Sequence, residues 1–228
     1  MTRRAAGVLL ILLLRASPAA AQDRPAAVEE RVPGLAERVL LPHLFSDVYA
    51  LRAAIVDLGD SLPDTRAAHL ERIDRIYLEA VRIAEGDPMH ALLLCSIATL
   101  PYWKFPAYVP LAGWVITVPV STESHADFIA RLSALPSMLL ADSRPGQDRD
   151  KLPHFFGSAW LQCVLRSRPL VDLIGRLIEA AESVFKLEGA RDPRDLDAGW
   201  FGAAFGDALG DDEDALPSRV LCSQRQRE

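Results

Sequence analysis

Hydrophobic residues recur at helical spacing along most of the chain, and this pattern predicts a mainly α-helical fold. About six or seven helices are expected, over about 35–51, from the turn at 61–65 to Gly86, 91–100, 123–135, 151–166, 170–187 and from Pro193 onward. The clearest stripe is formed by Ile73, Ile76, Tyr77, Ala80, Val81 and Ala84. We therefore expect one compact helical domain over residues 34–210.

One section departs from this pattern. Residues 105–120 are rich in β-branched and aromatic side chains, with Leu111-Ala112-Gly113 as a turn between two such runs. The prolines in both runs confine these strands to edge positions. The predicted fold class is thus mainly α, a single compact helical domain with a small β-ribbon near residues 105–120.

The N-terminus has the features of a signal peptide. Arg3 and Arg4 precede a short apolar run, 7–14, and then Ala19-Ala20-Ala21, which predicts removal of residues 1–21 before Gln22. The apolar run is far shorter than the roughly 20 residues that a bilayer requires. We expect an exported protein, periplasmic or in the cell envelope, that is not integral to the membrane after cleavage. Residues 22–33 are expected to be a linker and residues 211–228 a disordered acidic and polar tail.

Charge and cysteine content narrow the classes further. The formal net charge is -6, which excludes the basic surface needed to bind nucleic acid. Cys95, Cys163 and Cys222 show no C-x-x-C spacing, so a disulfide framework is not expected, although export permits one bond.

The chemistry gathers at the start of one predicted helix. Asp150, Lys151 and His154 lie in its first turns, and Pro153 is acceptable there because its missing N–H would have no intrahelical partner. Asp150 is expected at the N-cap. Its carboxylate is also four residues before His154, close enough to orient the imidazole.

A glycine stripe predicts which helix packs on this one. Gly202, Gly206 and Gly210 fall four residues apart in the last helix, and each interior glycine costs about 1 kcal/mol relative to alanine. We expect this face to pack closely on the small residues 157–159. Such packing brings the start of the last helix, with Asp192 and Asp195, towards Asp150 and His154 if the two helices run in the same direction.

The predicted site follows from this packing. His154, Glu182 and Asp195 are the candidate catalytic residues, Asp150 and Lys151 are further site residues, and a divalent metal would be held by His154, Asp150, Glu182 and Asp195. A structural reading stays open, in which Asp150 and Asp195 are helix caps and Glu182 pairs with Lys186.

The same residues carry a resemblance. Asp150-Lys151, His154-Phe155 and Ser158-Ala159, followed by Glu182, Asp195-Leu196, Gly202 and Gly206, resemble the YfiM-like predicted periplasmic lipoproteins and, more distantly, the VanZ-like membrane family. The resemblance covers about residues 148–210. It implies an envelope-located helical module whose Asp, His, Glu and Asp side chains face a common pocket. The chain departs from both families, since it has neither a lipobox cysteine nor a predicted spanning helix.

Two functions are therefore expected. The first is a non-enzymatic envelope protein, a structural module or one that contacts a partner protein or the membrane surface, with Asp150, His154 and Asp195 in a buried polar network. The second is a metal-dependent or acid/base hydrolase acting on a lipid or cell-wall substrate.

Overall fold

The computed structural model describes residues 42–59, 61–109, 114–119, 123–185 and 192–223. The predicted signal peptide, the linker and residues 34–41 lie outside them. The described helices are α3 Pro42–Asp57, α4 Arg66–Ile83, α5 Pro88–Ala98, α6 His125–Ala134, α7 Lys151–Leu165, α8 Arg168–Phe185, α9 Pro193–Asp211 and α10 Pro217–Cys222. The predicted mainly α-helical fold class is confirmed.

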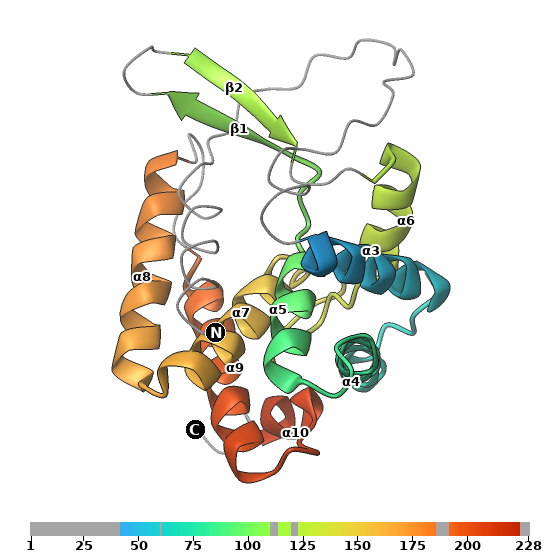
Figure 1. The fold of residues 1–228 in the computed structure, drawn as a ribbon, viewed down its shortest axis with the longest axis vertical. Helices are drawn as coiled ribbons and strands as arrows, with labels where there is room; N and C mark the ends of the chain where they lie inside the picture. Colours follow the sequence, from blue (N-terminus) through green and yellow to red (C-terminus); the bar gives the residue numbers. More distant parts are fainter. Residues whose placement is uncertain (1–41, 60, 110–113, 120–122, 186–191, 224–228) are drawn as a thin grey trace.

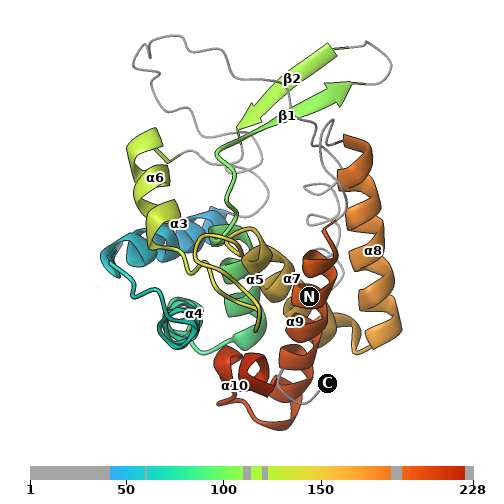
Figure 2. The same cartoon turned by 180° about the vertical axis from the view of Figure 1, so that it is seen from behind.

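Helix α5 lies at the centre of the molecule, with α3 and α4 on one side and α7, followed by α9 and α8, on the other (Figures 1 and 2). Its side chains are apolar around most of its circumference, and Leu92 and Leu94 are fully buried. Aromatic rings join the two sides: Phe205 lies edge-on to Tyr77 at 5.1 Å and is stacked on Phe155 at 5.8 Å. An all-apolar helix of this kind is expected inside a core.

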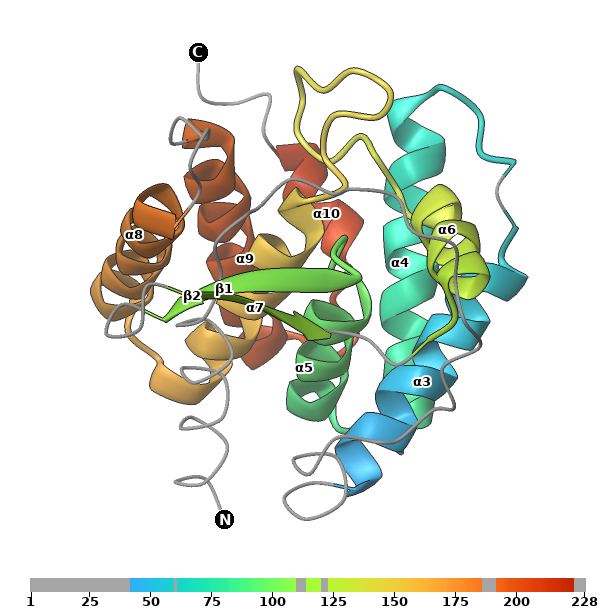
Figure 3. The same cartoon turned by 90° about the horizontal axis from the view of Figure 1, so that it is seen from above.

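The β-ribbon is not part of this helical body, so the predicted fold class needs a correction. Among the described residues, the strands β1 Lys104–Val109 and β2 Trp114–Pro119 pair only with each other, antiparallel, with Lys104 opposite Pro119. They lie beyond the ends of α5 and α8, outside the packed helices (Figures 1 and 3). The prediction of one compact domain that includes a ribbon is therefore wrong. The described helices bury their apolar faces against one another around α5, and the compact body contains no strand.

The predicted disordered tail, 211–228, is also wrong over α10. Leu221 is fully buried, the Ser218 N–H donates to the Asp74 carboxylate at 2.8 Å, and the Arg66 guanidinium donates to the Leu221 carbonyl at 2.8 Å. Both partners lie on α4. The acidic composition of the tail concealed this short apolar anchor.

Helices α7 and α9 form the closest helix pair, as the glycine stripe predicted. A Cβ placed on Gly202 would lie 2.8 Å from the Phe155 carbonyl carbon, and one on Gly206 would lie 2.6 Å from the Ala159 carbonyl oxygen. Since Phe155 faces Gly202 and Ala159 faces Gly206, the two helices run in the same direction. Gly210 does not belong to this contact, since a Cβ there would meet nothing within 4 Å.

Candidate functional site

The parallel packing of α7 and α9 brings their N-terminal ends together. Helix α9 begins as predicted, with the Asp192 carboxylate accepting the Arg194 N–H at 3.0 Å and Pro193 in the first turn. Helix α7 begins at Lys151 with Asp150 at its N-cap position, both as predicted, but the Asp150 carboxylate makes no capping hydrogen bond. Asp150 has helical backbone angles and accepts no backbone N–H, because its carboxylate turns to the Lys151 ammonium instead.

Lys151 is the centre of the site. Its side-chain nitrogen Nζ lies 2.8 Å from Asp150 Oδ2, 2.6 Å from Asp192 Oδ2 and 2.6 Å from Asp195 Oδ1. The residue is only 1% exposed. Burial opposes its charge, but the three carboxylates outweigh burial and raise the pKa of Lys151 above its ordinary value. This lysine is therefore a permanently charged, buried ammonium at neutral pH.

Asp195 links the lysine to the histidine. Its Oδ1 atom, which ion-pairs with Lys151, also lies 3.6 Å from His154 Nε2. Burial raises the pKa of the Asp195 carboxyl, against the lowering effects of His154 and Lys151. The His154 side chain is 21% exposed, so the imidazole lies at the edge of the network, between Asp195 and solvent.

The pKa of Asp192 is shifted in the opposite direction. Burial raises the pKa of Asp192, but the hydrogen bonds from Lys151 and from the Arg194 N–H lower it by more than burial raises it. The resulting pKa lies below its ordinary value. The pKa shifts of Asp192 and Asp195 thus differ because Asp195 is much more deeply buried than Asp192.

The structure brings together four of the five predicted site residues: Asp150, Lys151, His154 and Asp195. Glu182 lies in helix α8, but its side chain is outside the described part of the chain. Its predicted place in the site stays a prediction.

A second buried ion network adjoins the first, and no pattern in the sequence predicted it. Asp148 is fully buried and accepts hydrogen bonds from the Leu139 and Leu140 N–H groups at 2.8 and 3.0 Å, from the Ser143 hydroxyl and from Arg194 at 2.8 Å. These bonds, which outweigh its burial, lower the pKa of the Asp148 carboxyl. Residues 142–149 lie between two predicted helices, and their composition does not reveal a carboxylate that the loop folds around.

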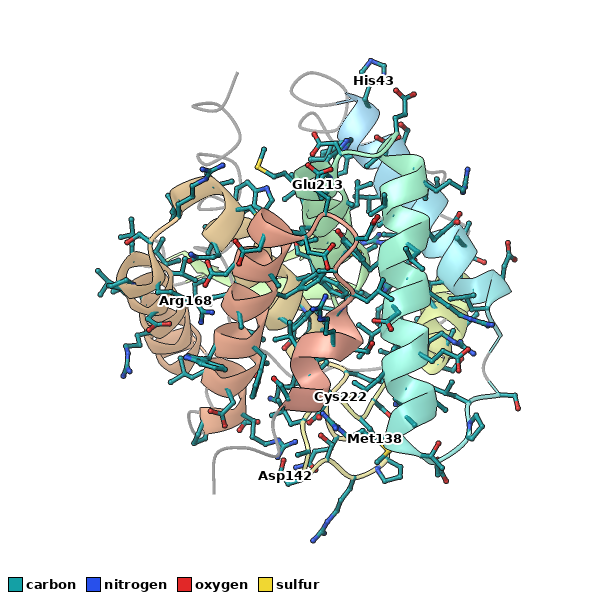
Figure 4. The ribbon with its side chains drawn as sticks, turned by 90° about the horizontal axis from the view of Figure 1, so that it is seen from below. His43, Met138, Asp142, Arg168, Glu213 and Cys222 are labelled. Atoms are coloured by element: carbon teal, nitrogen blue, oxygen red, sulfur yellow. The ribbon has the colours of Figure 1, made fainter. Side chains whose placement is uncertain are left out.

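Arg194 joins the two networks, since it follows Asp192 by two residues and also ion-pairs with Asp142 at 2.6 Å. Figure 4 shows Asp142 and Met138 on the loop before α7, close to the end of α10 that carries Cys222. The first turn of α9 therefore holds both the start of α7 and the loop that leads to it.

The donor set permits a direct assessment of metal binding. Oxygen atoms of Asp150, Asp192 and Asp195 lie within 4.8 Å of one another, the spacing of a cation site. The Lys151 ammonium already lies within 2.6 to 2.8 Å of all three carboxylates. A divalent ion among them would lie beside a buried positive charge, so the geometry favours the ammonium as the cation.

In comparisons with known proteins, no family model, no curated protein and no solved structure matches this chain. Across the described residues, no helix combines the length and hydrophobicity that crossing a membrane requires.

Proposed function

We propose that the protein is an exported helical module of the cell envelope, without catalytic activity, and that the Lys151 cluster is a structural ion network. The cluster is Lys151 with Asp150, Asp192, Asp195 and His154. One observation carries the proposal: the buried ammonium fills the space among three carboxylates that a substrate group or a metal would otherwise occupy. The export signal and the resemblance to periplasmic proteins support the location.

The network explains why the site joins two helix ends. An ammonium buried without partners costs many kcal/mol, so Lys151 is stable only while α7 and α9 keep their relative positions. In turn, the glycine contact fixes those positions along both helices. Packing and charge therefore specify the same arrangement.

The proposal is tested by replacing the cation. Lys151→Met retains the length of the side chain but leaves Asp195 buried without its ion pair, which costs about 3 to 5 kcal/mol. A second change, Asp195→Asn, removes the orphaned charge and should restore a large part of the stability. Thermal melts of the single and double variants measure this coupling.

Two results would contradict the structural role: an unchanged melt for Lys151→Met, or no recovery in the double variant. Asp150→Asn is the matched control, because Asp150 is half-exposed and its loss leaves two carboxylates on the ammonium. It should cost below about 1 kcal/mol.

Contact with a partner protein or the membrane surface is the activity that we assign to this module. Helix α8 supports it, since Leu170, Leu173 and Leu177 form an exposed apolar strip on one of its faces. Vesicle sedimentation separates the two partners. Binding that Leu173→Glu abolishes, and that Leu78→Glu on α4 retains, assigns the contact to lipid. Both leucines are 52% exposed, so the variants are matched. If the parent does not bind vesicles, contact with the membrane surface is contradicted.

A second function, acid/base hydrolysis of a lipid or cell-wall substrate, is favoured by the position of His154. A partly exposed imidazole 3.6 Å from a buried carboxylate resembles a general base with its orienting group. Elemental analysis of the purified protein, with His154→Ala as control, tests the metal-dependent form. Stoichiometric metal in the parent, lost in the variant, would establish that form and overturn the structural proposal.

A further inference from the structure

The loop between α6 and α7, residues 136–149, is here called the strap. Its backbone is tied together at Ser137, whose hydroxyl accepts the Gly146 N–H at 2.9 Å and whose carbonyl accepts the Asp148 N–H at 3.0 Å. Arg66 of α4 donates twice to the Leu139 carbonyl, at 3.0 and 3.2 Å. The strap thus closes on itself and lies against α4.

His69 of α4 binds the start of the strap. The Ser137 N–H donates to His69 Nδ1 at 3.1 Å, and the imidazole is buried. Because Nδ1 accepts a hydrogen bond, the neutral ring must carry its proton on Nε2. Nε2 is itself buried with no hydrogen-bond partner among the described residues.

Protonation is incompatible with this bond. A proton on Nδ1 would place two donors against each other, His69 and the Ser137 N–H. The charged groups that face the imidazole are Arg72 of α4, Arg149 of the strap and Asp64 before α4. Burial, the largest cause, and the two arginines lower the pKa of His69, while Asp64 opposes them.

We propose that His69 is a pH-responsive latch, whose protonation releases Ser137 and opens the strap. Opening of the strap affects the ion network through a series of hydrogen bonds and ion pairs. Ser137 orders Asp148, Asp148 binds Arg194, and Arg194 lies in the first turn of α9 beside the Lys151 cluster. Acidification therefore loosens the loop that delivers the chain to α7. This inference rests on the strap alone and not on the proposed function.

The lowered pKa of His69 determines how the stability of the closed strap depends on pH. His69 has a lower pKa in the closed state than the roughly 6.5 of a free histidine, so the closed strap is fully stable above that pH and loses stability as pH falls below it. At pH 5 a free histidine is protonated about 30-fold over its neutral form, which sets the upper limit on the increase in opening at about 30-fold.

Amide hydrogen exchange by NMR measures this opening at pH 7.5 and pH 5.0. After correction for intrinsic exchange, the opening of Ser137, Leu139, Leu140 and Asp148 amides should increase up to about 30-fold at the lower pH. Amides of the central helix α5 should change much less. In His69→Gln the pH response should disappear, whereas His43→Gln, at an exposed position of α3, should retain it.

The His69→Gln variant also distinguishes the titration of His69 from that of buried carboxyl groups. Burial raises the pKa of Asp74 and of Asp195, and both remain in His69→Gln, so a response that survives in this variant comes from them and overturns the latch. If His69→Gln fails to fold, the histidine ¹⁵N NMR spectrum of the parent protein provides the test. The Nε2–H tautomer at pH 7.5, giving way to the charged ring together with strap opening, supports the latch. Titration near 6.5 with unchanged strap amides would refute it.

Discussion

Gly202→Ala is the most direct test of the helix contact that builds the site. The added Cβ would meet the backbone of Phe155, with the carbonyl carbon at 2.8 Å and the Cα at 3.0 Å. Backbone atoms inside a helix cannot turn aside as a side chain can, so α7 and α9 must separate. Overpacking of this kind costs about 1 to 3 kcal/mol, and the better helix propensity of alanine returns only about 1 kcal/mol. Because the added Cβ would lie within 3.0 Å of backbone atoms, the upper end of this range applies, and we expect a net loss of about 2 kcal/mol.

Gly210→Ala provides the matched control in the same helix. Its Cβ would meet nothing within 4 Å, so only the propensity gain of up to about 1 kcal/mol remains. The two variants should thus differ by about 3 kcal/mol. At roughly 2 to 4 °C for each kcal/mol, their melting temperatures should differ by about 6 to 12 °C. If Gly202→Ala melts at or above the parent, the direct backbone contact does not exist in solution.

Two further predictions concern the ion network of the strap and the N-terminus. Asp148→Asn should cost about 3 kcal/mol or more, because it breaks a buried charge pair, whereas Asp142→Asn removes the exposed partner of Arg194 and should cost below about 1 kcal/mol. Since the pKa of Asp148 is lowered in the folded protein, the stability that its carboxylate contributes is present above about pH 4 and is lost as pH falls through the pKa of the folded state. The stability of Asp148→Asn should therefore depend less on acid than that of the parent. Equal melting temperatures for Asp148→Asn and Asp142→Asn would contradict this account. If residues 1–21 are removed as predicted, N-terminal sequencing of the mature protein should begin at Gln22, and residues 1–21 retained in a membrane fraction would refute cleavage.

The sequence predicted the helices because their signals are local. The apolar period located α4, and the prolines and acidic caps located the starts of α7 and α9 within a residue. The glycine stripe even gave a tertiary contact, since glycine inside a helix is costly unless another backbone lies against it. Gly210 shows the limit of that reasoning: the four-residue spacing continues along α9, but no atom of another element lies within 4 Å of a Cβ at this position.

The site was predicted in part for the same reason. Proximity along the chain placed Asp150, Lys151 and His154 together, and the glycine contact added the first turn of α9. Two features of the site could not be predicted from the sequence. Lys151 was expected as a further site residue, whereas it is the buried centre, and burial of a single lysine leaves no periodic mark. Asp148 lies in a polar loop whose fold depends on Arg194, 46 residues away in the chain.

The position of Lys151 explains why the cluster needs three carboxylates. The ammonium lies at the N-terminal ends of both α7 and α9, where the helix dipoles are positive and oppose a cation. Carboxylates are favoured at the same ends, so Asp150, Asp192 and Asp195 offset both the dipoles and the loss of solvent. They are not equivalent in this role, because only Asp195 is buried with the lysine. Neutralising either half-exposed aspartate therefore leaves a compensated network, whereas removing Lys151 leaves a buried carboxylate without its cation.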